Sequence, residues 1–159
     1  MNIRIGIGYD VHALEEGREF WLGGIKINHY KGASGHSDAD VIIHAICDAL
    51  LGALSLGDIG KYFPDTDPQY KNIDSKKLLV QVVEMVTSRG YIVGNVDVSL
   101  CLEKPKVGPY LPGMIKTLCA ILKIRETDVS IKATTSEGLG FVGREEGVEA
   151  HAVVLISKN

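Results

Sequence analysis

The sequence is poor in cysteine, and that scarcity limits the classes of protein to which it can belong. Only three cysteines occur in 159 residues, Cys47, Cys101 and Cys119. They are odd in number, widely spaced and surrounded by apolar residues, so neither a disulfide framework nor a thiolate metal site is expected. We interpret them as reduced thiols of a cytoplasm-like compartment.

The sequence also lacks an excess of positive charge and a long apolar run. Seventeen basic residues stand against twenty acidic ones, without the basic stripe typical of a nucleic-acid surface. The apolar stretches are interrupted by His44, Asp48 and Glu84, and none approaches the roughly 20 residues that span a bilayer. With no signal-peptide pattern before Ile3, we expect a cytoplasmic protein, bacterial or, if from a plant, of the plastid stroma. Neither a nucleic acid nor a membrane is expected as a partner.

The pattern of apolar residues predicts a mixture of strands and helices without a strict alternation. Strands are predicted over 3–9, 91–102, 129–135 and 148–157, with strand segments over 20–27 that are broken at Gly23-Gly24. Helices are predicted from an N-cap at Ser37 to about residue 55, over 75–89 after a cap at Asp74, and over 111–122, with loops at 58–73 and 138–147. The fold class is therefore α+β, one domain over 1–159, with a single-layer four-stranded sheet and helices packed on one face.

Two short segments near the N-terminus suggest a metal site. Asp10 and His12 are two residues apart on a predicted strand, so their side chains leave the same face. His44 lies in the predicted helix that follows. One carboxylate and two imidazoles form a three-ligand site with an open fourth position, which zinc suits best and for which Mn²⁺ and Fe²⁺ are alternatives. The competing interpretation is that each histidine is an ordinary structural residue.

Residues beside this trio have two interpretations each. Asp48 lies one helical turn after His44 and either orients its imidazole or faces solvent. His36 and Ser37 stand at the start of the same predicted helix, where free N–H groups can hold a phosphate, although Ser37 can equally be only a cap.

Polar residues further along the sequence indicate a functional site less clearly. The hydroxyls of Thr134 and Thr135 follow a predicted strand directly, and Glu137 can ligate a hard cation. The glycine-rich loop 138–144 matches no Walker or dinucleotide fingerprint. Lys104 and Lys106 can meet a phosphate or form a solvated turn. Three aspartates are interpreted as turn formers: Asp58, Asp65 and Asp67.

Taken in order, these motifs resemble the family of 2-C-methyl-D-erythritol 2,4-cyclodiphosphate synthases of the non-mevalonate isoprenoid pathway. The resemblance covers essentially the whole chain. It is carried by collinear motifs at Gly8–His12, His36–Asp40, Leu56–Gly60, Phe63–Pro68, Gly94–Val98, Pro105–Lys106, Lys132–Thr135 and Glu137–Gly147.

The resemblance implies a homotrimer with active sites between subunits and two bound cations. Asp10, His12 and His44 would hold Zn²⁺, and Glu137 would help to hold Mg²⁺ or Mn²⁺. The methylerythritol phosphate and its reacting phosphate would meet His36, Ser37, Asp58, Gly60, Phe63 and Asp65. The cytidine nucleotide would meet residues 102–108, including Lys106, together with Thr134 and Thr135. Phe141 and Arg144 would lie near the substrate or the trimer axis.

The implied reaction converts 4-diphosphocytidyl-2-C-methyl-D-erythritol 2-phosphate into the 2,4-cyclodiphosphate and CMP. His36 and Thr135 are the candidates for hydrogen bonds to the phosphates in the transition state. Some members of the family carry an acidic residue where this chain has His151, which bears on any isoprenoid-type ligand of an axial cavity. Two other functions fit the bare residues: a zinc-dependent phosphohydrolase, and a nucleotide- or metal-binding module without turnover.

Overall fold

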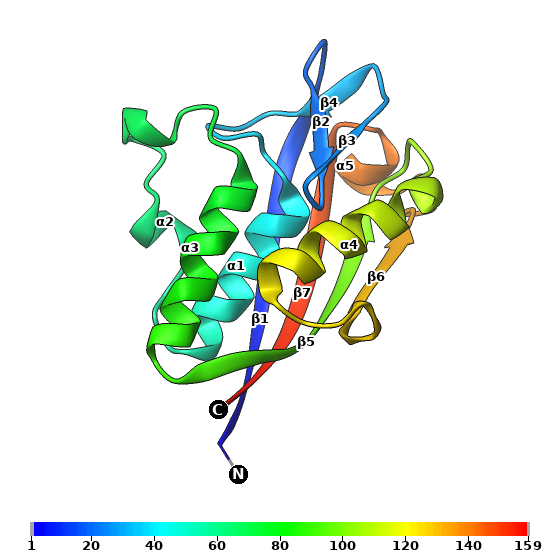
Figure 1. The fold of residues 1–159 in the computed structure, drawn as a ribbon. Coiled ribbons are helices and arrows are strands. Elements are labelled where there is room, and N and C mark those ends of the chain that lie inside the picture. Colours follow the sequence, from blue (N-terminus) through cyan, green and yellow to red (C-terminus); the bar gives the residue numbers. More distant parts are fainter. Residues whose placement is uncertain (1, 159) are drawn as a thin grey trace.

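The computed structural model describes residues 2–158 and has the α+β architecture that the sequence predicts. Figure 1 shows one main sheet with a two-stranded hairpin beside it. The strands are β1 (Ile3–Glu16), β2 (Phe20–Leu22), β3 (Ile25–Ile27), β4 (Lys31–Ala33), β5 (Tyr91–Cys101), β6 (Val129–Thr134) and β7 (Gly147–Lys158). The α-helices are α1 (Val41–Ala53), α2 (Ile59–Tyr62), α3 (Ser75–Ser88), α4 (Leu111–Leu122) and α5 (Gly140–Gly143), with 3₁₀ turns at Pro68–Tyr70, Gly108–Tyr110 and Glu126–Asp128.

The main sheet has five strands, in the order β4-β1-β7-β5-β6, so the prediction of four strands was wrong. All neighbours are antiparallel except β5 and β6, which run parallel. The fifth strand exists because β1 continues through the polar segment after Tyr9 as far as Glu16, where its last three residues pair with Lys31–Ala33. The predicted break at Gly23-Gly24 is confirmed, since both glycines have positive φ in the turn between β2 and β3.

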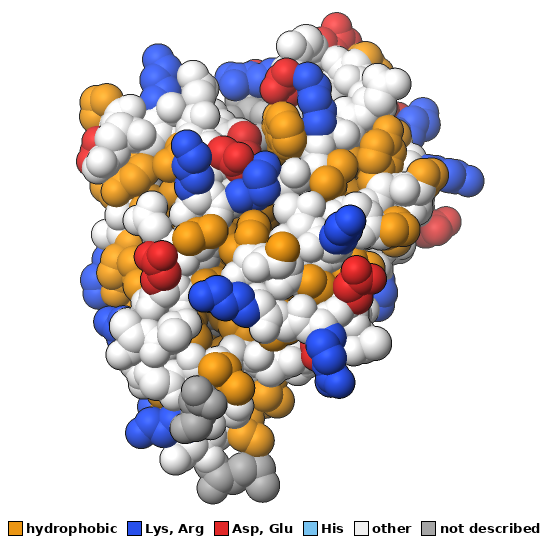
Figure 2. All heavy atoms as spheres, viewed as in Figure 1, with side chains coloured by type: hydrophobic (Ala, Val, Ile, Leu, Met, Phe, Trp, Pro, Cys, Tyr) orange, Lys and Arg blue, Asp and Glu red, His pale blue; other side chains and the backbone are white. Residues whose placement is uncertain are grey.

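The three long helices cover one face of this sheet, as predicted, and α1 lies between the sheet and α3 (Figure 1). That position explains why ten of its thirteen residues are buried. On the face seen in Figure 2, acidic and basic side chains are interspersed. No helix within residues 2–158 is long and apolar enough to cross a bilayer.

The N-cap of α1 is Asp40 and not Ser37, so the predicted start of this helix was wrong. Asp40 is fully buried and accepts hydrogen bonds from the backbone N–H groups of Ile43, Gly23 and Gly24, at 3.1, 2.9 and 2.7 Å. One carboxylate therefore caps α1 and fastens the β2–β3 turn to it. The predicted cap of α3 at Asp74 is confirmed. The loops expected at 58–73 and 138–147 contain the short helices α2 and α5 and one 3₁₀ turn.

Two glycines of β1 let α1 approach the sheet closely. A β-carbon at Gly6 would lie 1.8 Å from the carbonyl oxygen of Ala49, and one at Gly8 would lie 1.9 Å from that of Ala45. Any larger residue would therefore push the helix away from β1. This close contact sets the distance between the side chains of β1 and those of α1.

Candidate metal centre and substrate clefts

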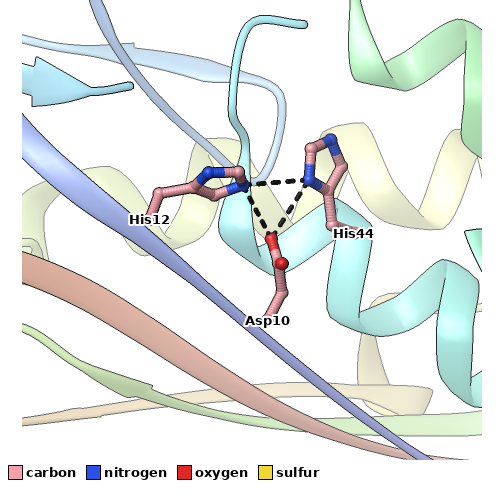
Figure 3. Close-up of side chains that lie close together, drawn as sticks. All are labelled: Asp10, His12 and His44. Carbon is pink, nitrogen blue, oxygen red and sulfur yellow. Dashed lines mark hydrogen bonds and ion pairs between the residues drawn. The ribbon is translucent and has the colours of Figure 1, made fainter. Parts of the chain in front are cut away.

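The side chains of Asp10, His12 and His44 converge at one point, as the sequence predicts. Asp10 and His12 project from the helix-facing side of β1, and His44 projects from α1 toward them (Figure 3). The Asp10 Oδ2 atom lies 2.9 Å from His12 Nε2 and 3.1 Å from His44 Nδ1, and the two nitrogens are 3.2 Å apart. The three side chains retain 24%, 16% and 12% of their exposure, so a ligand can reach them.

This donor set fits a divalent transition metal. Zinc bound by nitrogen and oxygen atoms at 2.0–2.1 Å in a tetrahedron would hold neighbouring donor atoms about 3.3 Å apart. The three separations found are close to that edge, and the three atoms occupy three corners only. A metal held here by these residues would keep a fourth position for a ligand.

The charges of the trio favour an ionised carboxylate and, without a metal, a protonated imidazole. Burial raises the pKa of Asp10, but hydrogen bonds from both histidines outweigh burial and lower it to about 2. Burial lowers the pKa of His44, yet the hydrogen bond to Asp10 and the nearby acidic charges raise it overall. A metal ion entering the site would therefore displace a proton from His44.

The outer nitrogens of the two imidazoles also have hydrogen-bond partners. His12 Nδ1 lies 3.0 Å from the carbonyl oxygen of Ser34, which can only accept, so this nitrogen carries the proton and Nε2 is free to bind a metal. His44 Nε2 lies 2.9 Å from Ser75 Oγ and 3.2 Å from Ser37 Oγ. Sequence reasoning missed Ser75, which stands 31 residues from His44 and carries no motif.

Asp48 makes a contact that the sequence did not predict. It is half-buried, and its Oδ1 accepts a hydrogen bond of 2.7 Å from the backbone N–H of Ile59. Burial raises the pKa of this carboxyl group. Asp48 thus ties α1 to the start of α2, which borders the cleft beside the metal trio.

That cleft has a volume of about 250 Å³ and contains several of the predicted substrate residues. His12, His44, His36, Ser37, Phe63 and Asp65 are among the residues that line it. His36 Nε2 lies 3.1 Å from the carbonyl oxygen of Asp67 and donates to it. Asp58 and Gly60 do not line this cleft, because Asp58 turns back to cap α2 at the N–H of Lys61.

A second cleft, of about 500 Å³, lies at the other edge of the sheet. It is lined by the segment from Leu102 to Pro109 apart from Lys104, and by the end of β6, including Lys106, Thr134 and Thr135. Thr135 Oγ1 lies 3.3 Å from Glu137 Oε1. Glu137 is not part of the cluster formed by the metal trio.

Three further residues singled out from the sequence lie outside both clefts. Phe141 belongs to α5, where its ring packs against Gly147. Arg144 follows α5 and forms two hydrogen bonds of 3.0 Å with Glu146. His151 is exposed on the sheet face that the helices leave open, with its ring 4.9 Å from that of Tyr9.

Comparison with known proteins gives a consistent result over the full chain. The family model of the YgbB family matches residues 3–157. A 2-C-methyl-D-erythritol 2,4-cyclodiphosphate synthase of Bacteroides thetaiotaomicron is 57% identical over 159 residues, all of both chains. The enzyme of that name from Porphyromonas gingivalis strain W83 is 56% identical over 153 residues, 96% of this chain and 94% of that one.

Solved structures of related proteins have the same fold. The bifunctional IspDF of Campylobacter jejuni superposes with a TM-score of 0.95 at 38% identity over 99% of this chain, which spans 42% of that longer chain. A CDP complex of IspF from Plasmodium falciparum gives a TM-score of 0.87 at 35% identity, covering 99% of this chain and 97% of that one. A CDP-bound 2C-methyl-D-erythritol-2,4-cyclodiphosphate synthase gives 0.90 at 40% identity, covering 97% of this chain and all of that one.

Proposed function

Because the chain belongs to the YgbB family, we propose for it the reaction of its 2-C-methyl-D-erythritol 2,4-cyclodiphosphate synthase relatives. The enzyme, a cyclising phosphorus–oxygen lyase, converts 4-diphosphocytidyl-2-C-methyl-D-erythritol 2-phosphate into the 2,4-cyclodiphosphate and CMP. One observation carries this proposal: Asp10, His12 and His44 meet beside a cleft in a chain that matches the family from residue 3 to residue 157. The whole chain acts as one domain in this proposal.

The reaction is an intramolecular phosphoryl transfer. An oxygen of the 2-phosphate forms a bond to the β-phosphorus, and the bond between that phosphorus and the CMP oxygen breaks, with the electron pair leaving on CMP. The attacking oxygen is already anionic at neutral pH, so the protein needs no strong general base. What it must supply is alignment and neutralisation of charge, and alignment alone contributes up to about 7–11 kcal/mol in well-oriented intramolecular reactions.

We assign Asp10, His12 and His44 to Zn²⁺, and Glu137 to a second ion, Mg²⁺ or Mn²⁺. When bound, such ions supply Lewis-acid polarisation of the phosphoryl group and balance its negative charge. The three ligands bring one carboxylate and two neutral imidazoles, a set that leaves a net positive charge on a divalent ion to attract phosphate.

His36 and Ser37 border the cleft beside the trio and are proposed to contact the reacting phosphate. The Nε2–H of His36 already donates to Asp67, so its other nitrogen can donate to a phosphate only when the ring is protonated. Phe63 and Asp65 share this cleft and are proposed to hold the methylerythritol unit. Asp58 and Gly60 would have to join them through a movement of α2.

The nucleotide is assigned to the second cleft, whose lining includes Lys106, Thr134 and Thr135. The CDP complexes among the related structures support a cytidine-linked substrate. Thr135 is proposed to donate a hydrogen bond to a phosphate at the transition state, and Phe141 and Arg144 are proposed to approach the substrate or the trimer axis.

The free cysteines support a reducing compartment, which we propose to be the cytoplasm.

The positions of the two clefts support a homotrimer with active sites between subunits. Two of the three metal ligands, Asp10 and His12, lie on β1 and the nucleotide residues lie at the end of β6, with β7 and β5 between these strands. Three strand spacings separate them by about 14 Å in one chain. The sheet face opposite the helices also exposes large apolar side chains, with Ile5 and Ile7 69% and 71% accessible, as expected of a surface that another copy covers.

The test is ³¹P NMR of the purified protein with the cytidylyl substrate, Zn²⁺ and Mg²⁺, beside a sample containing EDTA. Signals of a cyclic diphosphate and CMP that EDTA abolishes are the expected result. Release of orthophosphate or a linear product would instead identify a phosphohydrolase. Unchanged substrate under conditions in which CMP binds would leave a binding module.

A further inference from the structure

A buried hydrogen-bonded chain runs from the metal trio into the N-terminus of α3. His44 Nε2, the nitrogen that faces away from Asp10, lies 2.9 Å from the hydroxyl of Ser75. Ser75 is the first residue of α3 and is fully buried. Its hydroxyl donates in turn to Oδ1 of Asp38, and its backbone N–H donates to Oδ2 of Asp38 at 2.9 Å.

The number of available protons fixes the direction of these hydrogen bonds. A carboxylate only accepts hydrogen bonds, so the single proton of the Ser75 hydroxyl is used on Asp38. Toward His44 the same oxygen can then only accept, so this hydrogen bond needs a proton on Nε2. On the other side of the ring, Nδ1 lies 3.1 Å from the Asp10 carboxylate, to which it donates without a metal, and its lone pair would become available when a metal displaces that proton.

We propose that Asp38 and Ser75 are positioning residues that bind the Nε2 proton of His44 and thereby hold Nδ1 in place as the atom that binds the metal. The inference deepens the proposed function, on whose metal site it rests. Ser37 Oγ is a weaker competitor for the same proton, because it lies 3.2 Å from Nε2 and is not oriented by Asp38. Asp38 is held for its task by a third donor, the backbone N–H of Asp40 at 3.2 Å.

The hydrogen bonds from Asp38 through Ser75 also explain the orientation of the His44 ring. Ser75 holds Nε2 on one side of the imidazole and the trio holds Nδ1 on the other, so the ring cannot rotate without losing both contacts. Outer partners of this kind typically contribute about 10- to 100-fold to metal affinity. The outer nitrogen of His12 is held by a backbone carbonyl group, whereas that of His44 is held by two side chains, which mutation can change.

The direct test is long-range ¹H–¹⁵N NMR of Zn²⁺-loaded protein labelled in histidine. The wild type should show a proton on Nε2 of His44 that exchanges slowly with water, and Ser75→Ala should show faster exchange of that proton. Zn²⁺ affinity, measured by competition with a chelator, should fall about 10- to 100-fold in Ser75→Ala. Ser88→Ala is the matched control, because that serine of α3 bonds only to the carbonyl of Met85 and is exposed.

A second variant covers the case in which Ser75→Ala does not fold. In Asp38→Asn the amide group can donate to Ser75, which turns the serine proton toward Nε2 of His44, where it conflicts with the proton that the metal-bound ring must carry. The Zn²⁺ affinity of this variant should fall by a similar factor, and adding Asp38→Asn to Ser75→Ala should cost little more, because both changes break the same series of hydrogen bonds. Ser37→Ala should leave the Nε2 proton in place.

The proposal is overturned if Zn²⁺ binds His44 through Nε2, or if a folded Ser75→Ala or Asp38→Asn variant binds Zn²⁺ as tightly as the wild type. Failure of the proposed function would give a different result. An inactive protein with the expected Nε2 proton and affinities would remove the synthase assignment and leave the hydrogen bonds from Asp38 to His44 in place.

Discussion

Gly8 of β1 lies directly against the carbonyl oxygen of Ala45 in α1, so closely that a β-carbon at position 8 would come within 1.9 Å of that oxygen. Ala45 follows His44, and Gly8 precedes Asp10 by two residues on the same face of the strand. The contact that packs the helix on the sheet therefore also sets the distance between the metal ligands.

Gly8→Ala should move α1 away from β1 and separate His44 from Asp10. We expect loss of Zn²⁺ binding and of turnover, and a lower melting temperature because the backbone must shift. Gly52→Ala is the matched control: its β-carbon would meet only the carbonyl oxygen of Ile7, at 3.8 Å, and alanine favours a helix by about 1 kcal/mol. Equal Zn²⁺ affinity in the two variants would show that the close contact does not set the site.

His44→Ala should abolish turnover while the proposed trimer stays largely folded. The variant removes one of three donor atoms from the trio, yet the burial of α1 depends on its apolar neighbours. Zn²⁺ content, turnover and molar mass in solution are the measurements, with His29→Ala as the control because His29 lies away from both clefts. Loss of the oligomer together with the metal would make the site structural and not catalytic.

Asp40→Ala should destabilise the protein far more than removal of the cap of α3. The buried carboxylate of Asp40 satisfies three backbone N–H groups, so its loss should lower the free energy of unfolding by about 3 kcal/mol or more. Asp74→Ala removes a cap whose side chain is 40% exposed and should cost about 1 kcal/mol. Denaturant unfolding of both variants compares them directly, and similar losses would contradict the double role of Asp40.

The charges of the metal trio should stabilise the metal-free protein most in mildly acidic solution. The pKa of Asp10 falls from 3.8 to about 2 on folding, so its contribution of about 2 kcal/mol is present above pH 4 and lost as the pH falls toward 2. The pKa of His44 is raised above 6.5, so its contribution is present below 6.5 and lost as the pH rises beyond that value.

Melting temperatures in EDTA across this pH range, for the wild type and Asp10→Asn, measure both effects. The difference between the two proteins should be largest between about pH 4 and pH 6.5 and shrink on either side. A difference that stays constant with pH would show that Asp10 stabilises the fold without its charge.

The spacing of apolar and polar residues predicted those parts of the fold that depend on neighbouring residues in the sequence. The apolar alternation of β5, the stripes of α3 and α4, and the convergence of Asp10 with His12 all follow from the periods of strand and helix. The metal trio was predictable because two of its members, Asp10 and His12, are two residues apart on one strand and therefore share a face.

The wrong or missing predictions concern positions whose structure depends on contacts with distant segments of the sequence. Ser37 and Asp40 are both good caps, and Asp40, the actual cap, also accepts hydrogen bonds from the distant turn at Gly23-Gly24. The polar end of β1 becomes a strand because Lys31–Ala33 pairs with it. Ser75 could not be found, because its role depends on a contact that packing of α3 creates. Such contacts have no local signal in the sequence.

Two inactive variants should restore activity to each other if each active site is shared between subunits. His44→Ala disables the metal trio, and Ala133→Trp fills the nucleotide cleft that Ala133 lines. In a ring of three that contains both variants, one neighbouring pair joins an intact trio to an intact cleft, so about one third of the sites should work. Co-expression with two different tags isolates the mixed trimers, and ³¹P NMR measures their turnover against each parent. If one chain supplied both clefts to its own site, every site in the mixture would contain a defect and no activity would return.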